Sequence, residues 1–170
     1  MRIAVLGAGS IGCLVAAKLV EAGHDVLVHA RGEHGAMLAI SGLKVSGIWD
    51  FEINPDQWTV SIDEAGIHPS LEKSFDQSII TCKAKDTEKL SQIAALITNG
   101  PVLSLQNGLG NLEILNRFVF ENSAVGVTTN AVKRIAPGQI EWVGCGSISV
   151  GGTKGEQFAE TLSMFENNFN

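Results

Sequence analysis

The sequence predicts a single α/β domain in which a mostly parallel, doubly wound sheet carries helices on both faces. Three observations predict it: short apolar runs, helix-length segments that alternate with them, and a glycine-rich turn after the first run. Hydrophobic residues make up 45% of the 170 residues and charged residues 18%, which is enough apolar material for a packed core and argues against disorder. We expect residues 1–170 to form one domain.

The N-terminal segment predicts a strand, a helix and a second strand. Residues 2–6 are a nearly continuous apolar run, as in a strand that is buried on both faces of a parallel sheet. A helix is expected over residues 11–22, where apolar residues keep one stripe, and Gly23 suits its C-cap. Residues 25–29 predict the next strand, so the segment has the order of a βαβ unit.

The middle of the chain is less regular, and the alternation returns after it. Residues 33–41 predict a short helix, residues 43–62 predict strands or an excursion, and residues 63–74 predict a polar loop or a short helix. The further expected elements are a strand at 76–82, a helix at 86–98, a strand at 101–105, a helix near 110–120, a strand at 124–129, a hairpin within 132–151 and a last helix at 155–166.

The turn after the first strand has the pattern G-x-G-x-x-G. In this pattern the first glycine allows a tight turn, the second lets a pyrophosphate approach the backbone, and the third lets the helix pack closely on the strands. The helix N-terminus then offers N–H groups and a partial positive charge to the phosphates. The turn therefore predicts a Rossmann-type dinucleotide site, with a tight turn that binds nothing as the alternative; its residues are Gly7, Ala8, Gly9, Ser10, Ile11 and Gly12.

The end of the second predicted strand indicates which dinucleotide to expect. NAD-specific sites usually place a carboxylate there to hold the ribose 2′-hydroxyl. This sequence has Arg31 instead, whose guanidinium can pair with a 2′-phosphate through charge-assisted hydrogen bonds. The sequence therefore favours NADP. Glu33 is close enough to bind the ribose, which leaves NAD as the alternative.

Composition excludes several other classes of function. With 12 basic and 18 acidic residues the net charge is −6, which argues against a nucleic-acid-binding surface. The three cysteines form no CxxC pair and the four histidines show no metal-ligand spacing, so neither a disulfide framework nor a metal site is expected. No signal peptide or membrane-spanning run is recognised. These features favour a reducing, cytoplasmic setting without a membrane partner.

Four stretches make the sequence similar to the N-terminal domain of the ketopantoate reductase (2-dehydropantoate 2-reductase) family. They are the glycine loop with Arg31, Ile80-Thr81-Cys82-Lys83-Ala84, Gln106-Asn107-Gly108-Leu109-Gly110, and Gly126-Val127-Thr128-Thr129-Asn130-Ala131. The resemblance implies that Lys83 lies at the nicotinamide side of the cleft and that Asn107 contacts both cofactor and substrate, so these two are the expected catalytic residues. It also implies a main-chain contact to the cofactor at Val132, whereas Asn130 departs from the family and receives no role.

The resemblance also implies an activity. The family reduces 2-dehydropantoate, a small 2-keto acid, to pantoate with NADPH, a step of pantothenate biosynthesis. Its second, helical domain supplies the lysine that protonates the ketone oxygen. We expect that domain to be absent from residues 1–170, so this piece would bind cofactor and be nearly inactive alone. An apolar face left for that domain would favour a homo-oligomer.

Two alternatives to this function stay open. One is a stand-alone, non-catalytic module that binds or senses NAD(P). The other is a related dehydrogenase that acts on another 2-keto acid or on a sugar-like substrate, which a glycine loop cannot exclude.

Overall fold

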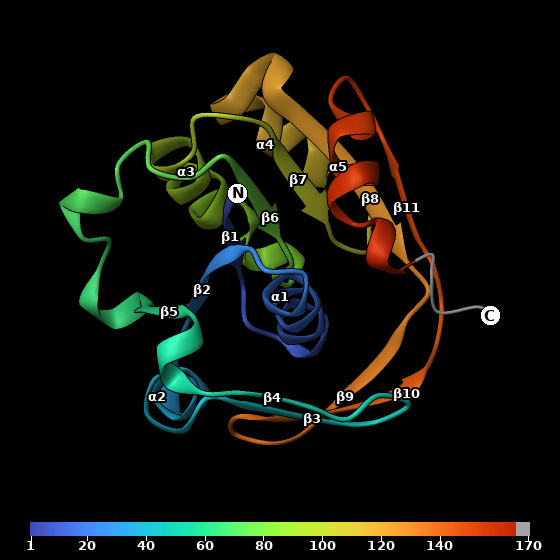
Figure 1. The fold of residues 1–170 in the computed structure, drawn as a ribbon. Helices are drawn as coiled ribbons and strands as arrows, with labels where there is room; N and C mark the ends of the chain where they lie inside the picture. The colour runs from blue at the N-terminus through green and yellow to red at the C-terminus, as the bar shows by residue number, and fades with distance from the viewer. Residues whose placement is uncertain (166–170) are drawn as a thin grey trace.

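The computed structural model of the protein describes residues 1–165, which form two β-sheets with α-helices around them (Figure 1). The larger sheet contains β1 (Arg2–Leu6), β2 (Asp25–Ala30), β5 (Thr59–Ile62), β6 (Gln77–Ile80), β7 (Val102–Leu105), β8 (Ser123–Thr128) and β11 (Ile148–Gly151). The smaller sheet contains β3 (Leu43–Gly47), β4 (Phe51–Ile53), β9 (Ala131–Ala136) and β10 (Gln139–Gly144). The helices are α1 (Ser10–Glu21), α2 (Gly32–Ser41), α3 (Thr87–Ile97), α4 (Asn111–Val119) and α5 (Gly155–Thr161).

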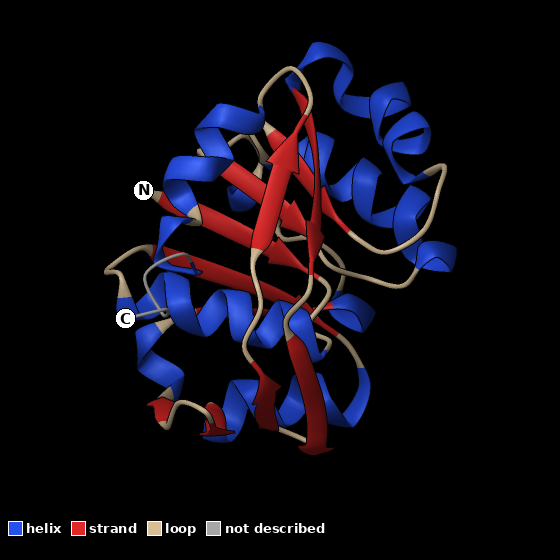
Figure 2. Ribbon diagram, turned by 90° about the vertical axis from the view of Figure 1, so that its right-hand side faces the viewer, coloured by secondary structure: helices blue, strands red, loops and turns tan. Residues whose placement is uncertain are grey.

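The larger sheet confirms the predicted doubly wound arrangement. Its strand order is β11-β8-β7-β6-β1-β2-β5, and its neighbouring strands run parallel except for the antiparallel pair β8 and β11. Helices lie on both sides of the sheet (Figure 2). The chain leaves β1 toward β2 on one side and later returns to β6 on the other. The carboxyl ends of β1 and β6 therefore form the switch point at which open α/β sheets bind ligands.

The two faces of the sheet bury separate apolar cores, because side chains alternate along each strand. On β1, Ile3 and Val5 pack with apolar residues of α1 and α5, whereas Ala4 and Leu6 pack with residues of α3 and α4. All four side chains are fully buried. The continuous apolar run that predicted this strand is therefore explained by a core on each face.

The smaller sheet is the part of the fold that the sequence did not specify. Its strand order is β4-β3-β10-β9, and it forms because β10 pairs in parallel with β3, which lies far away in the sequence. Of the strands expected within residues 43–62, β3 and β4 thus join the hairpin of β9 and β10, whereas β5 pairs with β2 in the larger sheet. Residues 148–151 leave the hairpin and pair with β8 at the edge of the larger sheet.

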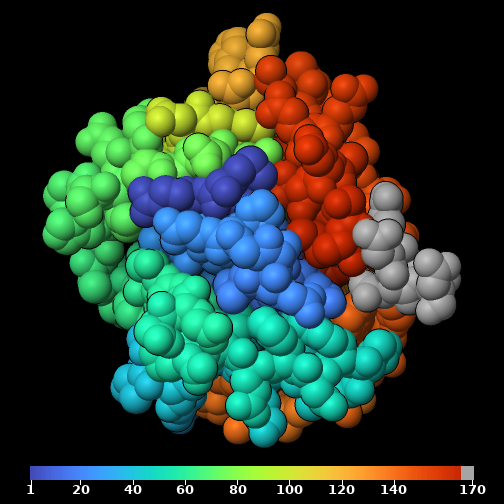
Figure 3. All heavy atoms as spheres, viewed as in Figure 1, coloured from blue at the N-terminus to red at the C-terminus, as the bar shows by residue number. Residues whose placement is uncertain are grey.

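The smaller sheet covers the face of α1 that points away from the larger sheet, so this helix is enclosed. In the space-filling view the blue α1 lies between the blue-green segment that includes β4 and the red α5 (Figure 3). Lys18 on this helix is only 5% exposed. Its ammonium lies 3.7 Å from the ring centroid of Trp49 and 3.0 Å from a carboxylate oxygen of Glu21, and Trp142 stands edge-on to Trp49. Two of the tryptophans therefore anchor the smaller sheet to α1.

Several element boundaries differ from the expectation. The segment 63–74 contains two short 3-10 turns, Asp63–Ala65 and Pro69–Leu71, and no α-helix. The last helix ends at Thr161 and continues as a 3-10 turn, Ser163–Phe165, while the expected end at residue 166 lies outside the described residues. Across residues 1–165, no helix combines the length and apolar character that crossing a bilayer requires.

Candidate dinucleotide-binding site

A cleft of about 800 Å³ opens at the carboxyl ends of β1, β2 and β6. Its walls come from the turn after β1, the end of β2 and the segment after β6, and residues 134–137, at the end of β9 and just after it, also line it. A volume of this size is typical of ligand-binding clefts. The cleft lies where the strand order of the larger sheet predicts a ligand site.

The three glycines of the loop stand in different surroundings. Gly7 has a positive φ of 111°, and a Cβ there would lie 2.8 Å from the backbone nitrogen of Cys82. A Cβ on Gly12 would overlap the carbonyl oxygen of Gly7 and lie 2.6 Å from Thr81 Oγ1. A Cβ on Gly9 would meet nothing within 4 Å. Close packing therefore requires glycine at positions 7 and 12, whereas position 9 is open on the cleft side.

The backbone of the loop leaves the start of α1 without internal hydrogen bonds. The N–H groups of Gly7 and Ala8 donate to the carbonyl of His29, at 3.1 and 3.2 Å. The first helical bond runs from Cys13 N to Gly9 O at 2.9 Å, so the N–H groups of the three residues between them precede it. Such a helix start suits an anionic group. Ser10, Ile11 and Gly12 are not part of the cleft lining among the described residues.

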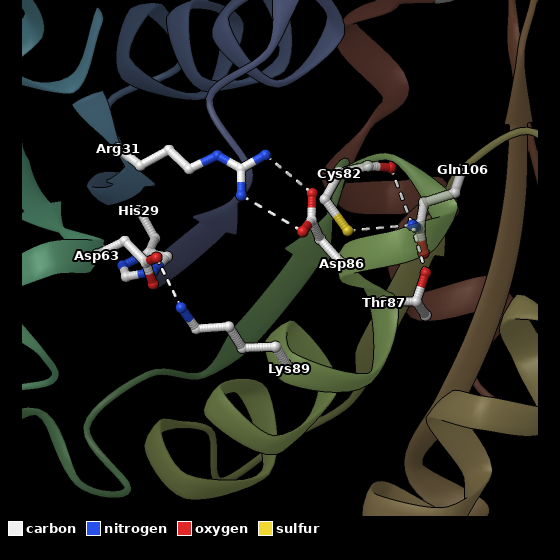
Figure 4. Close-up of polar contacts among 8 residues, drawn as sticks. All are labelled: His29, Arg31, Asp63, Cys82, Asp86, Thr87, Lys89 and Gln106. Atoms are coloured by element: carbon white, nitrogen blue, oxygen red, sulfur yellow. Dashed lines mark hydrogen bonds and ion pairs between the residues drawn. The ribbon is translucent and has the colours of Figure 1, made fainter. Parts of the chain in front are cut away.

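Arg31 borders the cleft, as expected, but its guanidinium already has a partner. Both of its terminal nitrogens contact the carboxylate of Asp86: Nη1 lies 3.3 Å from Oδ1 and Nη2 lies 3.0 Å from Oδ2 (Figure 4). Asp86 ends the 3-10 turn Ala84–Asp86, which follows β6. Glu33, the alternative ribose ligand, also lines the cleft but has no ion-pair partner within residues 1–165.

The cleft is richer in positive charge than the chain as a whole. Although the protein carries more acidic than basic residues, five cationic side chains line the cleft against three carboxylates. The cations are Arg31, Lys83, Lys85, Lys89 and Arg134, and the carboxylates are Asp63, Asp86 and Glu33. This excess of positive charge favours an anionic ligand.

A second polar cluster occupies the floor of the cleft beside Arg31 (Figure 4). The Nε2 atom of buried His29 lies 3.1 Å from Asp63, and Lys89 donates to the other oxygen of Asp63 at 2.6 Å. The hydrogen bond from Lys89 holds the pKa of the Asp63 carboxyl below its ordinary value. Burial lowers the pKa of His29 despite the nearby carboxylate. Asp63 is therefore negatively charged and forms an ion pair with Lys89.

Lys83 and Asn107 follow neighbouring parallel strands, as expected, and a buried glutamine joins their loops. Lys83 lines the cleft, whereas Asn107 is exposed and lies outside the cleft lining among the described residues. Between them, Gln106 Nε2 donates to the carbonyl of Cys82 and to Thr87 Oγ1, each at 2.9 Å (Figure 4). Gln106 thus fixes the loops after β6 and β7 against each other. The sequence identified this residue only as part of a motif.

The loop that holds Asn107 is braced from the other side as well. Thr87 donates to Asn111 Oδ1 at 3.0 Å, and Asn111 Nδ2 donates to the carbonyl of Gly108 at 3.1 Å. Because Asn111 and Thr87 are both buried, these bonds form in a place where water cannot replace them. The position of the loop backbone is therefore set by side chains of α3 and α4.

Val132 lies on β9, and Asn130 directly precedes that strand. Val132 is half-buried against the core and lies outside the cleft lining among the described residues, although Arg134 of the same strand lines it. Asn130, to which the sequence gave no role, is buried, and its Oδ1 accepts from Trp142 Nε1 at 3.1 Å and from Gly146 N at 3.0 Å. Asn130 therefore has a structural role in this chain.

His34 on α2 links the cleft to the β9–β10 turn. Its Nδ1 accepts a hydrogen bond from Gly138 N at 3.0 Å, and its Nε2 lies 3.4 Å from the Sγ of buried Cys13. Burial, with a smaller contribution from Arg134, lowers the pKa of His34 below its ordinary value of 6.5. Burial also raises the pKa of the Cys13 thiol to about 12, so this sulfur stays protonated. Neutral His34 is therefore the form that the fold requires.

We expect His34 to make the protein less stable in mild acid. Because its pKa is lower in the folded state, the unfolded chain takes up the proton first, so the stability is present above pH 6.5 and is lost as the pH falls below it. Urea unfolding at about pH 7.5 and about pH 5.5 measures this loss. His34→Gln, whose amide oxygen can still accept from Gly138, should show a smaller loss. An equal loss in both proteins would contradict the assignment and would point to His29 or His24, whose pKa values are lowered as well.

The described residues contain no cluster that suits a metal. Residues 1–165 hold no group of three or more histidine, cysteine, aspartate or glutamate side chains that could bind a metal ion. The three cysteines are free thiols, and Cys82, which lines the cleft, has its pKa raised to about 11, mainly by burial.

Comparison with known proteins agrees with this geometry. The family model described as ketopantoate reductase PanE/ApbA matches residues 3–155. The 2-dehydropantoate 2-reductase of Pyrococcus abyssi is 34% identical over 153 residues, which make up 89% of this chain and 47% of that protein. The enzyme of the same name from Archaeoglobus fulgidus is 34% identical over 165 residues, or 97% of this chain and 52% of that protein.

A solved structure shows the same fold over nearly the whole of this chain. D-mandelate dehydrogenase, in a ternary structure with NADH and anilino(oxo)acetate, superposes with a TM-score of 0.82 at 28% sequence identity, covering 99% of this chain and 55% of that one. The chain spans about half the length of the curated relatives it matches. The glycine loop, the lysine after β6 and the asparagine loop after β7 all fall within the matched region, and the chain belongs to the ketopantoate reductase PanE/ApbA family.

Proposed function

We propose that this chain is the NADP-binding domain of an oxidoreductase that reduces 2-dehydropantoate to pantoate. The observation that carries the proposal is the cleft at the switch point of the sheet, whose lining includes both the open glycine position Gly9 and Arg31. The family relationship supplies the substrate, a small 2-keto acid.

The residues present fit a dinucleotide. The open face of Gly9 leaves room for a pyrophosphate beside the free N–H groups at the start of α1, with Gly7, Ala8, Ser10, Ile11 and Gly12 forming the rest of the loop. The excess of cations in the cleft suits the negative charge of the phosphates. A carboxylate-rich cleft would have argued against such a ligand.

Two features bear on the choice between NADP and NAD. Arg31 stands at the end of β2, where a 2′-phosphate would lie, and more than half of its side chain is accessible. Asp86 and Glu33 are carboxylates that could accept from a ribose 2′-hydroxyl, and D-mandelate dehydrogenase was solved with NADH. We favour NADP because the arginine lies on the strand end itself, whereas the carboxylates lie on adjacent segments.

The cofactor would supply a hydride to the carbonyl carbon of the keto acid. In our proposal Lys83 and Asn107 lie at the nicotinamide end: Lys83 supplies a positive charge for the carboxylate of the keto acid, and Asn107 can both donate and accept hydrogen bonds. Val132 would add a main-chain contact to the cofactor. The proton for the ketone oxygen would come from the part of the relatives that residues 1–170 do not match, so residues 1–170 alone should show little turnover.

Calorimetric titration with NADPH and with NADH tests the proposal. We expect both nucleotides to bind and NADPH to bind more tightly, with a Kd in the micromolar range or weaker, on the order of 10⁻⁶–10⁻⁴ M. Lys83→Ala and Asn107→Ala should change the affinity for the whole dinucleotide but not for adenosine 2′,5′-bisphosphate, which lacks the nicotinamide end. If neither nucleotide binds, the glycine loop is a structural turn in this chain and the proposal fails.

A further inference from the structure

Among residues 1–165, the carboxylate that contacts Arg31 comes from a different segment of the cleft lining. Asp86 belongs to the turn after β6, whereas Arg31 follows β2, and the two strands are separated in the sheet by β1. The contact uses both terminal nitrogens of the guanidinium and both oxygens of the carboxylate (Figure 4). This is the paired geometry that a guanidinium also offers to a phosphate.

We propose that Asp86 is a specificity-determining residue that competes with the 2′-phosphate of NADP for Arg31. This inference rests on the proposed function, because it concerns the nucleotide that the cleft binds. Asp86 occupies the terminal face of the guanidinium, so a 2′-phosphate has to displace it or bind beside its negative charge. A ribose 2′-hydroxyl does neither, and it can donate to the same carboxylate.

The surroundings make this competition effective. The side chain of Asp86 is 22% exposed and that of Arg31 is 57% exposed, so the carboxylate is the more confined partner and the arginine is the one that can move. The other carboxylates of the cleft are arranged differently, since Asp63 is held by Lys89 and Glu33 has no ion-pair partner among the described residues. Asp86 is thus the acidic group through which the cleft can select against a 2′-phosphate.

Neutralising this carboxylate should shift the nucleotide preference. In Asp86→Asn we expect the Kd of NADPH to fall by about three- to tenfold, the range expected when an exposed ion pair and a like-charge contact are removed together. The Kd of NADH should stay within about twofold, because an amide oxygen can still accept from the ribose. The gain for NADPH should shrink as salt is added, because screening weakens the repulsion that has been removed.

The experiment titrates the wild type and Asp86→Asn with four probes: NADPH, NADH, adenosine 2′,5′-bisphosphate and adenosine 5′-monophosphate. The bisphosphate should gain with NADPH, and the monophosphate should not. The matched control is Asp25→Asn, which removes the carboxylate of another exposed arginine–aspartate pair, Arg2–Asp25, and changes the net charge equally. This control should leave all four affinities unchanged.

The outcomes separate this inference from the proposed function. If NADH and NADPH bind but Asp86→Asn leaves their ratio unchanged, the inference is overturned and the proposed function stands. Weaker NADPH binding in Asp86→Asn also overturns it, because Asp86 would then hold Arg31 in place for the phosphate. If no nucleotide binds either protein, the proposed function fails and this inference fails with it.

Discussion

Arg31→Ala is expected to weaken NADPH binding by about 10- to 100-fold, the amount that a charge-assisted hydrogen-bonded pair contributes. NADH should lose little, because it has no 2′-phosphate for the guanidinium to hold. The substitution also frees Asp86, whose charge then faces the phosphate without compensation, and this adds to the loss. Titration of the variant with both nucleotides measures the change in their ratio.

The control for this prediction is Arg117→Ala, which changes the net charge by the same amount on an exposed residue in the last turn of α4. Its affinities should match those of the wild type. An unchanged NADPH-to-NADH ratio in Arg31→Ala would show that the phosphate is held elsewhere. Arg134, which lines the cleft from β9, would then be the next residue to replace.

The parts of this site that the sequence predicted are those that local chain geometry determines. A glycine loop between an apolar strand and a helix fixes its own turn, and Arg31 follows the next strand at a spacing that the βαβ unit sets. The contact between Arg31 and Asp86 joins residues that are 55 positions apart, and no local pattern indicates it. The same holds for Gln106, whose role depends on two loops meeting.

The smaller sheet escaped prediction for a related reason. The hairpin of β9 and β10 is local and was expected, but its pairing with β3 brings Lys44 beside Gln139. Each strand alone shows only weak alternation of apolar and polar residues. The strands share α1 as their apolar partner, and a lysine on that helix, Lys18, does not indicate in the sequence that a second sheet covers it. Long-range pairing of this kind is decided by tertiary packing and not by propensity.

Alanine at Gly9 is expected to separate binding from folding. The position has extended backbone angles, and a Cβ there meets nothing within 4 Å, so the loss of stability should be below about 1 kcal/mol. The added methyl group nevertheless stands where the pyrophosphate would approach the backbone, so affinity for both nucleotides should fall by at least about tenfold. Urea unfolding and calorimetry on the same protein measure the two effects.

Alanine at Gly12 should, in contrast, lower the stability of the folded protein. Its Cβ would overlap the Gly7 carbonyl and crowd Thr81 Oγ1, which itself donates to that carbonyl at 2.6 Å. Overpacking against backbone atoms costs about 1–3 kcal/mol, so the urea midpoint should fall clearly. Equal stability of the two variants would contradict the close packing of α1 on the strands.

Normal nucleotide binding by a stable Gly9→Ala protein would mean that no pyrophosphate lies on this loop. The fold would then be intact, and only the placement of the ligand could be wrong.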